Sequence, residues 1–279
     1  MGKGILILIF SILFGGFSFP AFGYLLSAEY ILEVMIKNRG EYKALEVNQD
    51  TQFYDGKFPN GRSNAKEMIY LRKPLEFRVD GNYHKFAQTW VNKGHKSIII
   101  TDGQLTHEGQ FNHSFLKELF VAESGKELLK SLESAGIDGS IVSIARKDKE
   151  LVYLIGTTED RQDIPHFSIW KDRQFFPDRL LIQEFSGEDI INVEVRFSDY
   201  GENAPSWYPG LMEVFFNNVL VVNIRANRVR AFYRSNISDD LFDLKEIKKQ
   251  YPMAESPNRK LVISSSRIPE TLELLRKNY

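Results

Sequence analysis

Cysteine is absent from all 279 residues of the chain. A chain without cysteine forms no disulfide and has no thiol nucleophile. It also cannot carry the lipid that bacterial lipoproteins receive on a cysteine at their cleavage site. The stability of the protein must therefore come from its own hydrophobic core.

An excess of charge of either sign is also lacking. Lys and Arg number 36 and Asp and Glu number 37, so the formal net charge is −1. A balance this close to zero produces no strong electrostatic field. We therefore expect no nucleic-acid partner, and no stable electrostatic attachment to an anionic membrane.

Long apolar runs are missing from the chain except near its start. The run Ile5–Phe14 follows Lys3, and the small-residue sequence PAFG at 20–23 comes after it. A positive start, a short apolar core and a small-residue cleavage site are typical of a secretory signal peptide. The core is shorter than the roughly 20 residues that span a membrane comfortably. We predict a signal peptide over 1–23 and an exported, soluble protein over 24–279, with an uncleaved anchor as the alternative.

Alternating apolar and polar residues predict strands along most of residues 40–227. Predicted turns between the strands include Asp102-Gly103 and Asn217-Asn218. About ten strands joined by short turns indicate an antiparallel meander, and a sheet of that size must curl. In the first strand, one face carries Leu45, Val47, Gln49, Thr51 and Phe53.

Helical spacing of apolar residues marks the remaining segments. Helices are predicted over 27–38 and over 114–135, the latter split near Gly125. The segment DDLFDLKEIKKQYP predicts a short helix closed by Pro252, RKLVISSS a late strand, and PETLELLRKNY a helix that begins at Pro269. The predicted fold class is therefore mostly β with helices (α+β): one strongly curved antiparallel sheet, covered by helices on its concave side.

Large aromatic rings lie on the apolar faces of the predicted strands, including Phe77, Trp90, Phe197 and Phe216. Such rings either pack as a dry core or line a slot for an acyl chain. A slot has a sound energetic basis, since each methylene moved out of water contributes about 0.8 kcal/mol. One long acyl chain offers on the order of 10 kcal/mol before ordering costs.

Motifs for catalysis and metal binding are absent or incomplete. His84, His95, His107 and His113 fall in different predicted strands and turns, with no carboxylate at ligand spacing. The pattern S-x-x-K occurs twice without companion motifs, and G-x-S-x-G does not occur. We therefore expect no enzyme activity, no metal and no cofactor, and a hydrolase is the weakest alternative.

The segment SWYPG at 206–210 leaves two interpretations open. Trp207 and Tyr208 either stay exposed, where they touch a membrane or the mouth of a cavity, or fold back onto the core.

The order of these segments resembles that of the LolA-type outer-membrane lipoprotein-sorting proteins. The resemblance covers residues 28–245 and includes the strand–Pro–strand segment and the closing "LF". The segments that carry it are SAEYILEVMIKNRGEYKALEV, EMIYLRKPLEFRVDG, IIITDGQ, VEVRFSDYGENAPSWYPGLMEV and DDLFDL.

The resemblance implies a half or open β-barrel whose apolar cavity shields the acyl chains of lipids or lipoproteins in the periplasm. It implies a LolA-like domain over 24–245 and leaves 246–279 as a C-terminal extension packed on the same domain. The expected partners are acyl chains, an inner-membrane donor and an outer-membrane acceptor. We expect the protein to be a monomer and to touch the membrane only transiently. The alternative is an envelope sensor or interaction module with the same fold, which the extension favours.

We predict one set of residues for the wall of the apolar cavity and another for its lid. The cavity residues are Leu45, Val47, Leu75, Phe77, Val79, Trp90, Val195, Phe197, Val214 and Phe216, and the lid residues are Ile31, Met35, Leu116, Leu119 and Phe120.

Overall fold

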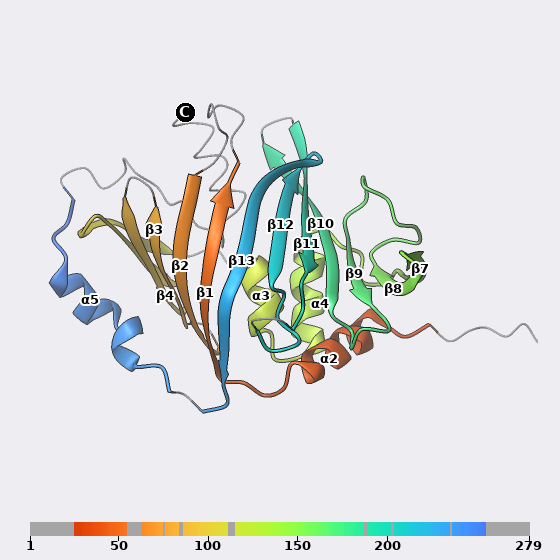
Figure 1. Cartoon of the computed structure of the whole chain (residues 1–279), viewed down its shortest axis with the longest axis horizontal. Coiled ribbons are helices and arrows are strands. Elements are labelled where there is room, and N and C mark those ends of the chain that lie inside the picture. Colours follow the sequence, from red (N-terminus) through yellow and green to blue (C-terminus); the bar gives the residue numbers. More distant parts are fainter. Residues whose placement is uncertain are drawn as a thin grey trace, which may run out of the picture.

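The chain forms one large antiparallel sheet of 13 strands in the order β6-β5-β4-β3-β2-β1-β13-β12-β11-β10-β9-β8-β7 (Figure 1). The computed structural model describes residues 25–54, 63–74, 76–83, 86–110, 115–186, 189–201, 204–234 and 236–254. The strands are β1 (Ala44–Phe53), β2 (Ser63–Arg72), β3 (Glu76–Tyr83), β4 (Ala87–Lys93), β5 (Lys96–Thr101), β6 (Gln104–Gln110), β7 (Val142–Lys147), β8 (Glu150–Ile155), β9 (His166–Trp170), β10 (Pro177–Ser186), β11 (Asp189–Ser198), β12 (Leu211–Phe216) and β13 (Val219–Phe232).

The sheet consists of two meanders joined at their long central strands. Strands β1 to β6 pair in chain order, β7 to β13 do the same, and β1 pairs with β13 from Ala44↔Phe232 to Phe53↔Val222. Among the described strands, β6 and β7 form the two edges, so the sheet is not closed.

Three helices pack against one face of the sheet, which we call the inner face. They are α2 (Ala28–Asn38), α3 (Phe115–Val121) and α4 (Gly125–Ser134). Their apolar side chains share a buried cluster with residues of β8 to β13, and α3 also reaches the inner face of β1 to β5.

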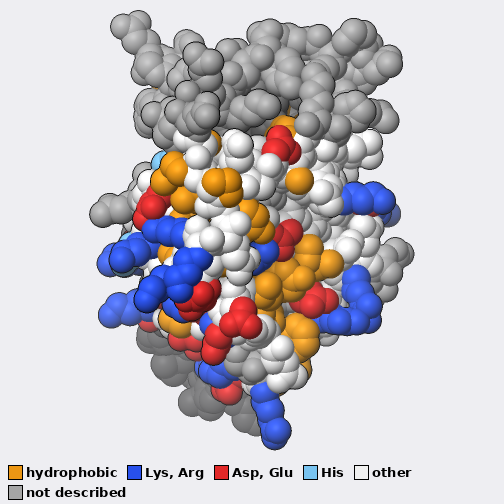
Figure 2. Space-filling view, turned by 90° about the vertical axis from the view of Figure 1, so that its left-hand side faces the viewer, with side chains coloured by type: hydrophobic (Ala, Val, Ile, Leu, Met, Phe, Trp, Pro, Cys, Tyr) orange, Lys and Arg blue, Asp and Glu red, His pale blue; other side chains and the backbone are white. Residues whose placement is uncertain are grey.

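The opposite, outer face of β1 to β6 is covered by the end of the described chain. A 3₁₀ turn, η1 (Asp239–Phe242), and helix α5 (Leu244–Gln250) place Phe242 and Ile247 against Val91, Ile98 and Ile100. Figure 1 shows α5 well apart from α2, α3 and α4. Figure 2, seen from the α5 side, shows hydrophobic side chains among Lys, Arg, Asp and Glu on this surface.

Local sequence signals place most elements where the structure has them. Ser27 is the N-cap of α2, and its side chain accepts a hydrogen bond from the Tyr30 N–H. The turn between β12 and β13 is Asn217-Asn218, with positive φ at both residues, which suits a two-residue hairpin. The helical segment 114–135 is split as predicted, because Ser124 caps α4 directly before Gly125.

Two sequence predictions on the strands are corrected. The sheet has 13 strands where about ten were expected, and β13 continues to Phe232, past the predicted end of strand structure near 227. Strand β6 has the sequence QLTHEGQ, whose polar residues hide the alternation that marks a half-buried strand. Its pairing with β5 over Lys96↔Gln110 to Thr101↔Gln104 makes it a strand nevertheless.

Several predicted segments lie outside the described residues. These are the signal peptide, the late strand RKLVISSS and the helix that begins at Pro269. Within the described residues, none of the helices has the length and apolar character that crossing a bilayer requires.

Candidate functional site

The inner face of β1 to β5 is organised in rows of side chains that run across the strands. The pairing registers define a first row of Leu45, Leu71, Phe77, Asn92 and Ser97, a second row of Val47, Ile69, Val79, Trp90 and Ile99, and a polar row of Gln49, Glu67, Gly81, Gln88 and Thr101. Within a row, residues on adjacent strands lie directly opposite each other and are close enough for their side chains to make contact.

The predicted cavity residues fall into two buried clusters, one on each half of the sheet. Leu45, Val47, Phe77, Val79 and Trp90 pack together on β1 to β4. Val195, Phe197, Val214 and Phe216 pack on β11 and β12 with the helices. Leu75 lies outside the described residues. The structure thus brings nine of the predicted residues onto the inner face, but in two groups rather than in one wall.

The predicted lid residues lie on α2 and α3. Ile31, Met35 and Leu119 are buried in the cluster on β8 to β13, and Phe120 contacts both clusters. Leu116 lies in α3, and its side chain is outside the described residues. Phe120 therefore bridges the two halves of the interior.

The loop between β11 and β12 folds back onto the core, which decides between the two interpretations of SWYPG. Trp207 and Tyr208 are buried in the cluster on β1 to β4. The Trp207 ring stacks on Tyr42 with centroids 5.0 Å apart, and the Tyr208 ring stacks on Phe120 at 4.9 Å. Burial raises the pKa of Tyr208 well above its usual value.

Two side chains at the end of α2 hold α3 in place. The Arg39 guanidinium donates to the backbone oxygens of Leu119 and Ala122, the latter at 3.0 Å, and the Tyr42 hydroxyl donates to the backbone oxygen of Phe120. These carbonyls lie at the C-terminal end of α3, where the last carbonyl oxygens have no N–H donor within the helix and a nearby cation is favourable. Burial lowers the pKa of Arg39 and raises the pKa of Tyr42 to about 12.

Helices α2 and α4 touch through backbone at Gly125. A Cβ atom there would lie 2.4 Å from the Glu29 backbone oxygen and 2.6 Å from the Glu33 nitrogen. The Gly125 N–H donates to Glu33 Oε2 at 2.7 Å. Only glycine allows this approach, so α2 and α4 form a closely packed pair next to the smaller α3.

The polar row contains a hydrogen-bonded carboxylate. Glu67 accepts from Gln49 Nε2 at 2.8 Å, from Thr51 Oγ1 at 2.6 Å and from the Tyr83 hydroxyl at 3.0 Å. Burial, followed by the negative charge of Glu67, raises the pKa of Tyr83 well above its usual value, so the hydroxyl stays a donor. Next to it, Gln88 Nε2 donates to Thr101 Oγ1 at 3.1 Å.

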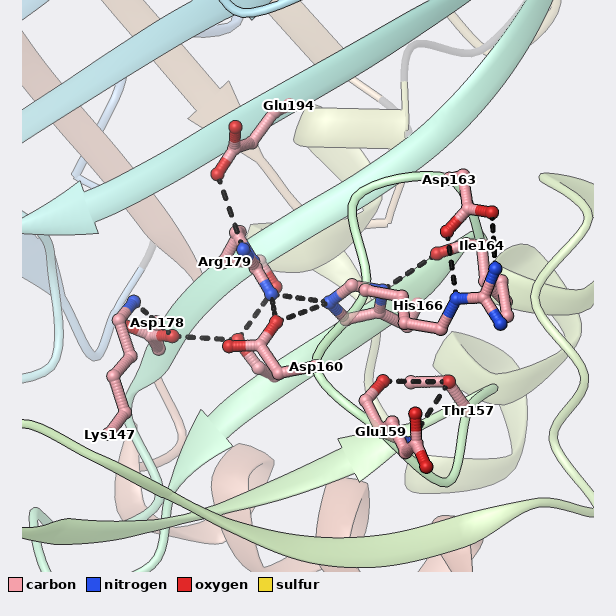
Figure 3. A network of polar contacts seen from close by, with 12 residues as sticks. Lys147, Thr157, Glu159, Asp160, Asp163, Ile164, His166, Asp178, Arg179 and Glu194 are labelled. Atoms are coloured by element: carbon pink, nitrogen blue, oxygen red, sulfur yellow. Dashed lines mark hydrogen bonds and ion pairs between the residues drawn. The ribbon is translucent and has the colours of Figure 1, made fainter.

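A charged network lies on the outer face of β9 to β11 (Figure 3). Arg179 contacts Asp160, Glu194 Oε1 at 3.6 Å and His166 Nε2 at 2.8 Å. His166 Nδ1 contacts the Ile164 backbone oxygen at 2.7 Å, so the ring carries its proton on Nδ1 and accepts at Nε2. The network ties the loop before β9 to the sheet.

The described residues hold no group of three or more His, Asp and Glu side chains arranged for a metal ion. Of the four histidines in the candidate metal cluster, His84 and His113 lie outside the described residues. Ser168, from one S-x-x-K match, donates to Asp178 Oδ2 at 2.8 Å within the sheet.

These features define a class of protein: an open antiparallel sheet with helices and a folded-back loop over one apolar face. No family model matches the sequence, and no curated protein matches it. The structure is similar to that of a LolA superfamily protein from Nitrosomonas europaea, with a TM-score of 0.53, 11% identity, and coverage of 78% of this chain and 98% of that chain. A DUF1329 family protein from Desulfovibrio piger matches with a TM-score of 0.49, 9% identity, and coverage of 80% and 100%.

The chain has a LolA-like fold. At 11% identity, the likeness to the Nitrosomonas europaea protein establishes the fold alone.

Sequence reasoning missed Arg39, Tyr42 and the polar row of the inner face. The alternation of β1 already placed Gln49 and Thr51 on the same face as Leu45 and Val47, which was the available signal. The contacts of Arg39 with α3 span 80 residues and leave no local pattern.

Proposed function

We propose that this protein is a periplasmic carrier that shields acyl chains of lipids or lipoproteins between the concave side of its sheet and its helices, and passes them towards the outer membrane. The LolA-like fold and the apolar clusters of the inner face support this function. The proposal involves no bond-making step and no cofactor.

The observation that carries the proposal is the way in which the interior is covered. The cover consists of α3 and residues 204–210, which lie over Phe77 and Trp90 and over the first two rows. An acyl chain reaches these rings only after the cover moves. Three hydrogen bonds from Arg39 and Tyr42 hold α3, and ring stacking holds Trp207 and Tyr208.

The burial of an acyl chain offsets much of the energy that holds this cover in place. A net hydrogen bond contributes about 0.5–1.5 kcal/mol and an aromatic pair a similar amount. Burial of one long acyl chain offers on the order of 10 kcal/mol before ordering costs. Opening the cover loses the three hydrogen bonds, the two ring stacks and the burial of side chains such as Val121, Trp207 and Tyr208, so the gain and the loss are of the same order of magnitude. The closely packed pair of α2 and α4 is anchored in the other cluster, on β8 to β13.

The first test is to export the full chain into the periplasm of a bacterial host, purify it and identify co-purifying lipid by mass spectrometry. The same protein is titrated with a fluorescent fatty-acid probe. We expect both measurements to detect lipid. Repeated preparations that contain no lipid and do not bind the probe would refute the carrier function.

A substitution at Arg39 tests whether the cover controls access. Arg39→Leu leaves two buried carbonyls without their donor and destabilises the covered conformation by about 1–3 kcal/mol. The apparent affinity for the probe should then rise, roughly fivefold or more, because a larger fraction of molecules is open to binding. The matched control is Lys37→Leu, whose side chain is 72% exposed on the same helix. Equal probe affinities in the wild type and both variants would show that α3 does not control access.

The second candidate function is an envelope sensor that acts through protein contacts. The segment on the outer face favours the sensor function. After η1 and α5, the chain reaches Met253, which is 58% exposed and lies beside Leu105 on the edge strand β6, where a partner protein could bind. Deletion of residues 245–279 separates the two functions. A carrier keeps its probe affinity after the deletion, whereas a sensor loses its partner in a pull-down.

A further inference from the structure

We propose that Asn92 and Ser97 form a hydrogen-bonding site on the inner face for an amide or hydroxyl group attached to an acyl chain. This inference rests on the proposed lipid-binding function and names the chemical class of the ligand. Asn92 is 0% exposed and Ser97 1% exposed. Neither the amide nitrogen and oxygen of Asn92 nor the hydroxyl of Ser97 has a hydrogen-bond partner among the described residues.

The two side chains are direct neighbours in the sheet. Asn92 on β4 pairs with Ser97 on β5, and Asn92 pairs on its other side with Phe77. Trp90 and Ile99, which flank them on the same face, belong to the buried apolar cluster under the cover. The pair is thus a polar site at the end of the first row, next to the apolar second row.

Such an interruption is unfavourable for the fold itself. A buried amide or hydroxyl without a partner loses its hydrogen bonds to water and recovers nothing in return. Leucine and alanine would fill the same positions without that loss. The nearby polar row shows the contrast, because Gln88 and Thr101 bond to each other and Glu67 accepts three donors. The unsatisfied pair is therefore placed for a group that comes from outside the chain.

The donors and acceptors of the pair define that group. The Asn92 amide presents two N–H donors and a carbonyl acceptor, and the Ser97 hydroxyl both donates and accepts. An ester or a plain hydrocarbon cannot use the acceptor of Asn92, because neither has a hydrogen to donate. A hydroxyl on the chain, or an amide linkage to it, donates and accepts at once. The first two rows would contact the hydrocarbon on either side.

The experiment compares two probes of equal chain length, tetradecanoic acid and 3-hydroxytetradecanoic acid, by calorimetric titration of the full-length protein. We expect the wild type to prefer the hydroxylated acid roughly fivefold or more, the effect of one net hydrogen bond. Asn92→Leu should remove this preference while keeping or improving affinity for the plain acid. Ser97→Ala, a smaller change, should reduce the preference in the same direction.

Gln88→Leu is the matched control, because Gln88 is a buried amide on the same strand and face whose nitrogen donates to Thr101. It should keep the preference and lower the midpoint of thermal unfolding, whereas Asn92→Leu should raise that midpoint. Equal affinity of the wild type for both acids, or a preference that survives in Asn92→Leu, overturns this inference and leaves the carrier function intact. Failure of both acids to bind overturns both proposals.

Discussion

Arg39 and His166 are both buried basic residues, but Arg39 makes its contacts as a cation and His166 makes its contacts as a neutral ring. The Arg39 guanidinium stays charged and donates to carbonyls of α3. The His166 ring stays neutral, because its Nε2 accepts from Arg179 and its Nδ1 donates to a backbone oxygen. Each residue therefore depends on its protonation state for the contact that it makes.

Acidification should weaken the charged network through His166. Desolvation lowers the pKa of His166 below its ordinary value near 6.5, against the opposing effect of Glu194 and Asp178. The unfolded chain takes up a proton near that value while the folded protein does not. The free energy of unfolding should therefore fall as the pH drops below about 6.5 and level off below the folded pKa.

Urea unfolding of the wild type and of His166→Gln between pH 7 and pH 5 measures this effect. Glutamine keeps a donor and an acceptor but does not titrate in this range. The variant should lose less stability on acidification than the wild type. Identical pH dependences would show that His166 is not the source of the acid sensitivity.

At the scale of elements, the three helices on the inner face divide into a closely packed pair and a short helix held by side chains. α2 and α4 meet through backbone at Gly125, while α3 has seven residues and is held at its C-terminal end by Arg39 and Tyr42. A helix of this length is marginal without tertiary contacts. Among the three helices on the inner face, α3 therefore depends most on these side-chain contacts.

Gly125→Ala should separate α2 from α4. The added Cβ would meet backbone atoms that cannot rotate away. We expect a loss of about 1–3 kcal/mol in the free energy of unfolding, as for overpacked cores. Lys126→Ala, an exposed change at the next position, is the control and should be nearly neutral. A Gly125→Ala variant as stable as the wild type would mean that the two helices adjust freely.

On the scale of the whole molecule, the two faces of the sheet serve different purposes. The inner face carries the candidate site and its cover, and the outer face of β1 to β6 is closed by η1 and α5. Phe242 is fully buried on that outer side, and its ring lies 4.9 Å from the Arg72 guanidinium. Stability and ligand binding should therefore respond separately to changes on the two faces.

Phe242→Ala tests this separation. The substitution should lower the free energy of unfolding by about 3–5 kcal/mol, the usual effect of removing a buried ring. The affinity of the folded fraction for the fatty-acid probe should stay unchanged, because the ring lies on the opposite face. Leu241→Ala, at a half-buried neighbouring position, is the milder control. A lower probe affinity of the folded Phe242→Ala protein would indicate that the two faces are coupled.

The sequence by itself determined most of the elements, because alternation, helical spacing, Ser27 and Asn217-Asn218 act between near neighbours. It also indicated which side chains, such as Phe77 and Val195, face the interior. Only the tertiary structure decided that β1 pairs with β13, that Arg39 holds α3, and that Asn92 and Ser97 meet unsatisfied on the inner face. These contacts join residues from different strands and helices, and their energies depend on burial and partners that the chain acquires only when it folds.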